Sequence, residues 1–232
     1  MKTLIVIPTY NERENITALV PAVFQTTPEV EILVVDDNSP DGTGDVVRSL
    51  QGRHPRLHLL SRGGKEGLGR AYLAGFRWGL EKGYGAIVEM DADFSHRPED
   101  LRTILAVLPE YDFVVGSRWV AGGGTVNWGL GRKIISRGGS FYARQILGFP
   151  MRDFTGGFNA WKASTLAKLG LDSVRSEGYS FQIELKYRAL KLGFHGKEVP
   201  IIFADRRVGQ SKMSSRIVFE ALFRVWGLRR AV

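Results

Sequence analysis

Residues 87–96 read IVEMDADFSH, and this stretch decides how the rest of the chain is interpreted. Its apolar start leads into three acidic residues, Glu89, Asp91 and Asp93. On an extended chain, side chains two residues apart point the same way, so the two aspartates are expected to converge on one point. Converging carboxylates repel unless a cation lies between them, and a hard divalent ion is the natural occupant. The alternative is that the aspartates cap a helix beginning near Pro98, and the spacing alone favours neither interpretation.

The overall composition indicates one globular domain. The chain has 232 residues, 44% of them hydrophobic and 24% charged, which is enough for a single α/β domain with a sizeable core. It has no cysteine, which excludes disulfides, thiolate metal sites and a cysteine nucleophile. No apolar run approaches the ~18 residues needed to span a bilayer. We therefore expect residues 1–232 to form one domain without a transmembrane segment.

Short apolar runs alternate with helical segments over the first half of the chain, residues 1–118. The runs cover residues 4–7, 32–35, 57–60, 87–90 and 113–115. Such alternation predicts a mainly parallel sheet flanked by helices on both faces. Ligands of these sheets bind beyond the carboxyl ends of the strands. A polar cluster follows every run, so we predict a nucleotide-binding half with its site at that edge; the clusters are residues 9–12, 36–41, 62–70, 91–93 and 117–118.

The second half, residues 119–232, differs in character. Three glycines at 122–124 predict a hinge or loop, and a last strand is expected over residues 197–203. Residues 132–147 and 216–232 mix apolar and basic residues, as helices lying on a membrane surface do. A helix with one face in the core and a solvated basic face would show the same pattern, so both interpretations stay open.

Seven segments of the chain carry motifs, namely PTYNE (8–12), VVDDNSPDGT (34–43), MDADFSH (90–96), GSR (116–118), DFTGGFNA (153–160), GYSFQIE (178–184) and DRRVGQSK (205–212). In this order, and over essentially the whole chain, they resemble the inverting family 2 glycosyltransferases of GT-A fold, above all dolichol-phosphate (polyprenol-phosphate) mannose synthases. The chain departs from that pattern at Gly156, where serine is commoner, and at Arg97, where proline usually follows the histidine. Neither departure touches a predicted metal ligand.

The resemblance implies transfer of mannose from GDP-mannose to dolichyl or polyprenyl phosphate, with inversion at the sugar and release of GDP. It implies Mg²⁺ or Mn²⁺ as cofactor, held with the diphosphate by the segment of Asp91, Ala92 and Asp93. Arg118 is expected to contact phosphate. The other expected donor-binding residues are the nucleotide contacts Pro8, Tyr10, Glu12, Val35 and Asp37 and the basic loop residues Arg206 and Lys212, which would close over the donor.

The chemistry of this reaction calls for positive charge more than for a base. The leaving group is a diphosphate, whose developing charge would be offset by the metal on Asp93 and by Arg118, Arg206 and Lys212. A lipid phosphate is already anionic at neutral pH, so we expect no general base. Arg118 and Arg132 are the candidates to hold that phosphate, because guanidinium suits bidentate contact.

Several of these residues have a plainer explanation. Asp37 follows a strand and could form a turn instead of contacting the nucleotide. His96 suits a loop or a helix cap as well as a metal. Arg132, together with the basic loop residues, could be solvated surface charge. Glu89 is not expected to be a third metal ligand.

Other functions remain to be weighed against this one. UDP-glucose or another nucleotide sugar could be the donor, and a non-catalytic nucleotide-sugar-binding subunit is the alternative of another class. A nicotinamide dehydrogenase is excluded because no GxGxxG follows the first strand. The net charge of +8 suits phosphorylated ligands and anionic membranes, whereas acidic loops at the site disfavour nucleic acid.

The expected acceptor also implies a location. A lipid phosphate lies in a bilayer, so the protein is expected in the cytoplasm, bound peripherally to the cytoplasmic face of a membrane. Some similar proteins continue into transmembrane helices, whereas this sequence ends at Val232. It is therefore expected to be a catalytic module without its own anchor, and a membrane-anchoring partner protein is compatible with that expectation.

Overall fold

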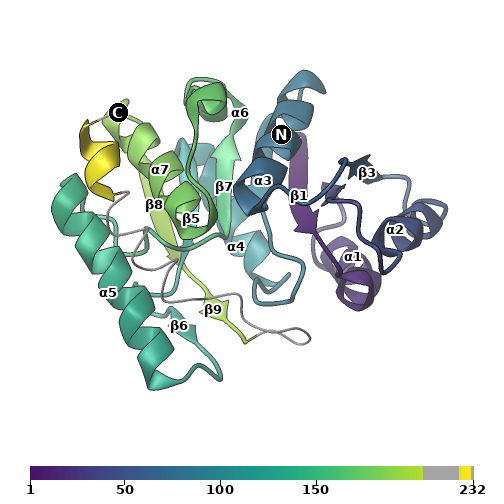
Figure 1. Ribbon diagram of the computed structural model, residues 1–232, viewed down its shortest axis with the longest axis horizontal. Coiled ribbons are helices and arrows are strands. Elements are labelled where there is room, and N and C mark those ends of the chain that lie inside the picture. Colours follow the sequence, from purple (N-terminus) through teal and green to yellow (C-terminus); the bar gives the residue numbers. More distant parts are fainter. Residues whose placement is uncertain (206–224, 231–232) are drawn as a thin grey trace.

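The computed structural model describes residues 1–205 and 225–230. Its centre is a seven-stranded sheet in the order β3-β2-β1-β4-β7-β5-β8. All neighbours are parallel except at β7, which runs antiparallel to β4 and β5 (Figure 1). The prediction of a mainly parallel α/β sheet is confirmed. Its strands are β1 (Thr3–Thr9), β2 (Glu31–Asp36), β3 (Leu57–Ser61), β4 (Ala86–Glu89), β5 (Phe113–Ser117), β7 (Asn159–Lys162) and β8 (Gly196–Pro200).

Helices cover both faces of the sheet (Figure 1). Along β1, Leu4 and Val6 enter one hydrophobic cluster, with residues of α3, α5, α6 and α7. Ile5 and Ile7 enter the other, with residues of α1, α2 and α4. This alternation is the pattern of a strand buried on both faces. The helices are α1 (Arg13–Thr26), α2 (Thr43–Gln51), α3 (Leu68–Glu81), α4 (Asp100–Val107), α5 (Leu130–Leu147), α6 (Ala163–Leu166) and α7 (Gly178–Lys191), with 3₁₀ turns at Leu108–Glu110 and Leu171–Ser173.

The two halves of the sequence share the main sheet. β7 belongs to the second half, yet it lies between β4 and β5 of the first. The strand predicted over residues 197–203 is in fact two strands, because β8 ends at Pro200, which has no N–H for a further ladder bond. After it, β9 (Ile202–Phe203) pairs with β6 (Gly124–Thr125) in a second, two-stranded sheet.

The glycines predicted as a hinge lead into that small sheet. Gly122 has a φ of +84°, a backbone conformation that favours glycine. At Gly123 a Cβ would lie 2.5 Å from the backbone oxygen of Ser117. The loop prediction is confirmed at Gly122 and Gly123, where these glycines allow a close approach to the end of β5 before β6 begins at Gly124. That the segment acts as a hinge stays a prediction.

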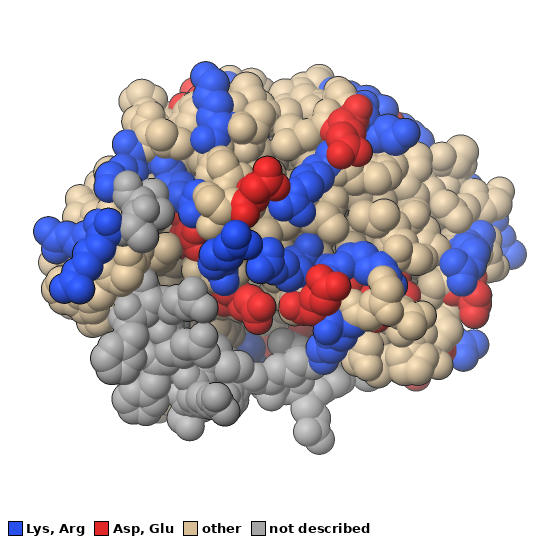
Figure 2. Space-filling view, turned by 45° about the horizontal axis from the view of Figure 1, so that its top comes forward, with Lys and Arg blue, Asp and Glu red and all other residues tan. Residues whose placement is uncertain are grey.

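The positive charge is spread over the surface on the side shown in Figure 2. There the coloured Lys and Arg side chains are interspersed with Asp and Glu, without one continuous basic surface among the described residues in view. That nucleic acid is not a partner stays a prediction. No helix within residues 1–205 and 225–230 combines the length and apolar character needed to cross a bilayer.

Candidate active site

A pocket lies beyond the carboxyl ends of the strands, where the sequence predicted it. It gathers nine of the predicted site residues, namely Pro8, Tyr10, Glu12, Asp37, Asp91, Ala92, Asp93, Arg118 and Arg132. Val35 is not among them, because its side chain points into the hydrophobic core and is fully buried. Arg206 and Lys212 lie outside the residues that the structure describes. We call Glu12, Asp37, Asp91 and Asp93 the acidic wall, and Arg118, Trp128 and Arg132 the basic wall.

Two neighbouring aspartates at the end of β2 have different roles. Asp36 makes the turn, because its carboxylate accepts hydrogen bonds from the Ser39 backbone N–H (3.1 Å) and hydroxyl (2.6 Å) and from Thr9 (2.9 Å). Asp37 does not, and its buried Oδ1 has no hydrogen-bond partner in the described part of the chain. Burial raises the pKa of Asp37 even though Arg62 lies 3.4 Å away. A buried acceptor in the pocket wall suits a ligand's hydroxyl or base N–H.

The loop after β3 closes the pocket beside Tyr10. The ammonium of Lys65 lies 4.3 Å from the centroid of the Tyr10 ring, and both residues line the pocket. Glu12, on the same side, accepts a hydrogen bond from the Asn15 side chain at 2.7 Å. The sequence analysis missed Lys65, although the cluster at residues 62–70 pointed to its loop.

The DAD segment forms a turn, not an extended chain. β4 ends at Glu89, and Phe94 has a φ of 62°. The argument from strand alternation is therefore wrong, although Asp91 and Asp93 both reach the pocket. They do not cap α4, because Asp93 Oδ1 instead accepts the backbone N–H of Ser95 at 3.1 Å. Asp91 Oδ1 accepts the Tyr72 hydroxyl at 3.0 Å.

His96 holds this turn in place. Its Nδ1 accepts the backbone N–H of Asp91 at 2.9 Å, so the neutral ring carries its proton on Nε2. The ring stacks on Phe158 with centroids 4.7 Å apart, and burial lowers its pKa. Neither nitrogen is then open to a metal, which favours the loop interpretation of His96.

The donor set suits a hard divalent ion shared with a ligand. The structure describes no group of three His, Asp or Glu side chains arranged around one metal position, within residues 1–205 and 225–230. Two carboxylates at the pocket are the usual protein share of a Mg²⁺ site, whose remaining positions are filled by substrate phosphates and water. Asp91 and Asp93 fit that share.

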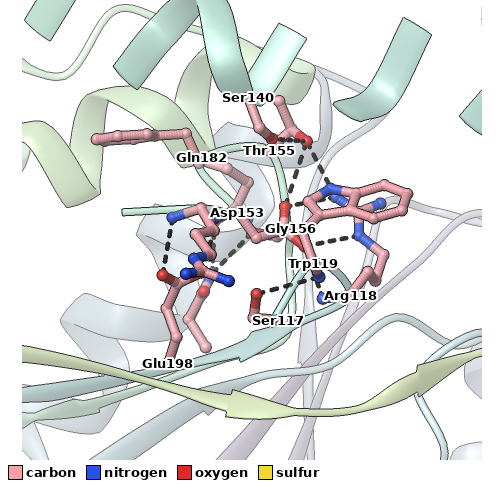
Figure 3. A network of polar contacts seen from close by, with 12 residues as sticks. Ser117, Arg118, Trp119, Ser140, Asp153, Thr155, Gly156, Gln182 and Glu198 are labelled. Atoms are coloured by element: carbon pink, nitrogen blue, oxygen red, sulfur yellow. Dashed lines mark hydrogen bonds and ion pairs between the residues drawn. The ribbon is translucent and has the colours of Figure 1, made fainter. Parts of the chain in front are cut away.

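Arg118, on the basic wall, is held by a buried carboxylate (Figure 3). Its Nε and Nη2 donate to the two oxygens of Asp153 at 2.8 and 2.7 Å, and Nη2 also donates to Thr155 at 2.9 Å. Burial raises the pKa of Asp153, but the guanidinium outweighs it and the net change is downward. Glu198 in turn accepts the backbone N–H groups of Arg152 and Asp153 (Figure 3). No local pattern of residues predicts this pairing, because Arg118 and Asp153 lie 35 residues apart.

A buried polar network lies behind the pocket. Glu89 accepts hydrogen bonds from Asn159 (3.1 Å), Trp161 (2.7 Å) and Gln182. Lys186, fully buried, donates to backbone oxygens of the 153–157 turn. Burial raises the pKa of Glu89 and lowers that of Lys186. The Glu89 carboxyl group thus links β4 to β7 and α7 by hydrogen bonds, and we assign it a structural role behind the pocket.

Arg132, the other arginine of the basic wall, lies on the first turn of α5. Its Nη1 donates to Asp205 at 2.8 Å. Its guanidinium carbon lies 3.9 Å from the ring centroid of Trp128. The side chain therefore has defined partners and is not simply solvated surface charge.

Two known proteins are similar to this chain over nearly its whole length. A model of glycosyl transferase family 2 matches residues 4–170. Undecaprenyl-phosphate mannosyltransferase of Micrococcus luteus is 49% identical over 98% of this chain and 95% of that protein. Polyprenol monophosphomannose synthase of Mycolicibacterium smegmatis is 49% identical over 98% of this chain and 88% of that protein.

Solved structures of similar fold have far lower identity. Glucosyl-3-phosphoglycerate synthase of Mycobacterium tuberculosis, in complex with Mn²⁺, UDP and glucosyl-3-phosphoglycerate, has a TM-score of 0.69 and 18% identity, over 97% of this chain and 80% of that one. A mannosyltransferase of Pyrobaculum calidifontis, in complex with GDP-mannose and Mn²⁺, has a TM-score of 0.62 and 17% identity, over 99% and 73%. At such identities the likeness shows the fold alone.

The sheet, the pocket at its carboxyl edge and these likenesses define a glycosyltransferase of GT-A fold. The match over most of the chain and the two relatives at 49% identity place it further: the chain belongs to glycosyl transferase family 2.

Proposed function

We propose that this protein transfers mannose from GDP-mannose to a polyprenyl phosphate such as dolichyl phosphate. The products would be GDP and β-linked polyprenyl-phosphate mannose. The observation that carries the proposal is the pocket itself, whose lining includes both the acidic wall and the basic wall. Such a pocket suits a metal-bound diphosphate on one side and an anionic acceptor on the other. The two relatives at 49% identity, which are named for polyprenyl-phosphate mannosyl transfer, support the same substrates.

On the acidic wall, Asp91 and Asp93 would hold Mg²⁺ or Mn²⁺ against the diphosphate of the donor. The ion would neutralise the charge that the departing diphosphate acquires. Tyr72 and His96 fix Asp91 through its carboxylate and its backbone N–H, and the Ser95 backbone N–H holds Asp93, so the oxygens are placed before the donor arrives. Asp37, whose buried Oδ1 accepts no hydrogen bond from the described residues, is the residue that we assign to the nucleoside.

On the basic wall, Arg118 and Arg132 would hold the acceptor phosphate. One of its oxygens attacks the anomeric carbon while the bond from that carbon to the diphosphate oxygen breaks, and GDP leaves with the electron pair. The configuration inverts because attack and departure are in line. No side chain needs to remove a proton, because the attacking oxygen is already anionic at neutral pH.

The outer face of α5 supports peripheral contact with a membrane. Three large apolar side chains on it are mostly exposed, Leu130 at 77%, Ile134 at 70% and Phe141 at 60%. The inner face is buried in the core through Ala143 and neighbouring residues, so the helix does not need this apolar surface for folding. With exposed Arg137 among them, these residues suit an anionic bilayer, and we propose the cytoplasmic face. A separate membrane-anchoring partner stays a prediction.

The test is product formation by the purified protein. GDP-mannose, Mg²⁺ and a polyprenyl phosphate in detergent or vesicles should give a mannosylated lipid, with β configuration by NMR. Transfer from UDP-glucose alone would contradict the proposal and favour the alternative donor. Binding of GDP-mannose without any turnover, under conditions in which the Micrococcus luteus relative is active, would favour a non-catalytic subunit.

A further inference from the structure

Trp128 lies between two guanidinium groups of the pocket. It precedes α5, is 8% exposed and lines the pocket. The guanidinium carbon of Arg132 is 3.9 Å from its ring centroid, and that of Arg118 is 5.6 Å away. The Phe203 ring meets the indole edge-on at 5.2 Å. Guanidinium groups are attracted to the face of an indole, so Trp128 fixes where Arg132 lies relative to Arg118.

The polar atoms at this position are incompletely paired. Trp128 Nε1 and Arg132 Nε are both buried and have no hydrogen-bond partner among the described residues. A buried N–H without an acceptor is unfavourable, and such atoms commonly mark a site for a ligand or water. Carboxylates already occupy other nitrogens of the two arginines, through Asp153 and Asp205. The unpaired donors are those left for an incoming anion.

We propose that Trp128 is a positioning residue of the acceptor site, which holds Arg132 beside Arg118 through its ring and donates its indole N–H to the phosphate monoester of the acceptor. This inference rests on the proposed function for the identity of the acceptor. The inference itself requires only that the ligand is a phosphate monoester anion.

Two substitutions separate the ring from its N–H. Trp128→Phe keeps an aromatic face for Arg132 and removes only the donor, so the KM for polyprenyl phosphate should rise about 3–10-fold. Trp128→Leu removes both, and the KM should rise by about 30-fold or more. The KM for GDP-mannose should stay within about twofold in both variants, a split that general damage to the fold would not give.

Trp119 offers a matched control in the same chain. Its ring is 5.4 Å from Arg118 and its Nε1 is also buried without a partner, but it does not line the pocket or contact Arg132. Trp119→Phe should therefore leave the KM for polyprenyl phosphate unchanged. If Trp119→Phe and Trp128→Phe raise this KM equally, or if Trp128→Phe raises the KM of the donor as much as that of the acceptor, the proposal is wrong.

A binding measurement makes the test independent of turnover. A short-chain isoprenyl phosphate, titrated into the wild-type protein without donor, should change its tryptophan fluorescence in a saturable way. The change should be lost in Trp128→Phe and kept in Trp119→Phe, and an unchanged signal in Trp128→Phe would overturn the proposal. Inorganic phosphate tests whether the headgroup alone suffices. If the wild type makes no mannolipid, the proposed function fails, while this titration still decides the role of Trp128.

Discussion

The acidic and basic walls of the pocket differ in the partners of their charged side chains. On the acidic wall, hydrogen bonds from neighbouring residues hold Asp91 and Asp93, and the buried Oδ1 of Asp37 accepts no hydrogen bond from the described residues, although Arg62 lies 3.4 Å from it. On the basic wall, each arginine has a carboxylate partner distant in sequence, Asp153 for Arg118 and Asp205 for Arg132. We therefore expect the acidic wall to take up a cation, whereas the basic wall is already partly neutralised and is proposed to bind an anion through its remaining donors. The following changes would break or sharpen this contrast.

Loss of a carboxylate from the acidic wall should have the largest effect. Asp93→Asn removes a negative oxygen from the proposed metal position, and mannolipid formation should fall by about 10³-fold or more. Chelation of divalent ions should abolish activity in the wild type, and Mg²⁺ or Mn²⁺ should restore it. Asp172→Asn is the control, because that carboxylate is 95% exposed and does not line the pocket. Full activity of Asp93→Asn would refute the metal assignment.

On the basic wall, the buried ion pair should matter for stability. Asp153→Asn leaves the Arg118 guanidinium buried without its anion, and the free energy of unfolding should fall by roughly 3–5 kcal/mol at neutral pH. Chemical denaturation measures this loss.

The same variant gives a pH signature. Because Arg118 outweighs burial and lowers the pKa of Asp153 in the fold, the unfolded state takes up this proton first as pH falls. The stability that Asp153 contributes is therefore full above its unfolded pKa of about 3.9 and is lost as pH falls through its lowered folded pKa. The difference between wild type and Asp153→Asn should shrink in acid; a constant difference would contradict the ion-pair explanation.

Arg132 should affect the acceptor alone. Arg132→Lys keeps the charge but loses the planar group that lies over Trp128, so the KM for polyprenyl phosphate should rise about tenfold. The KM for GDP-mannose should not change. Arg137→Lys, on the exposed face of the same helix, is the control. An equal effect of both substitutions would mean that Arg132 acts only through the general charge of α5.

The smallest effect concerns the membrane. Replacing Ile134 and Phe141 by serine should weaken binding to anionic vesicles by about tenfold in a sedimentation assay. Activity on a water-soluble short-chain acceptor should be kept. Leu192→Ser removes a similarly exposed apolar residue, at 58%, from the end of α7 and should change neither. Equal vesicle binding by all three proteins would rule out α5 as the membrane-facing surface.

The contrast between the walls also explains what the sequence could predict. Strands and helices of the first half follow from local apolar patterns, and their order places the acidic wall at the sheet edge. Contacts of the basic wall join residues far apart in sequence, as in the Arg118–Asp153 pair, and no local pattern reports them. The insertion of β7 is hidden for the same reason, since its short strand pairs with two strands of the other half.

Local backbone geometry explains how two predictions from the motifs differ from what the structure shows. The spacing of Asp91 and Asp93 was interpreted as an extended chain, but Phe94 adopts a left-handed backbone conformation and the segment turns. Val35 was carried over from the resemblance, and its side chain lies in the core, so its contact with the nucleotide stays a prediction that only its backbone could fulfil. In both, the motif located the site, while backbone geometry decided which atoms reach it.

The central claim is that one pocket joins a nucleotide-bound mannose to a lipid phosphate. A competition experiment tests it most directly: equal amounts of GDP-mannose and UDP-glucose are offered together with Mg²⁺ and a polyprenyl phosphate, and the lipid products are identified by mass spectrometry with stereochemical standards. We predict mannosylated lipid as the main product. Glucosylated lipid as the main product, or no glycolipid in the presence of metal, would contradict the account.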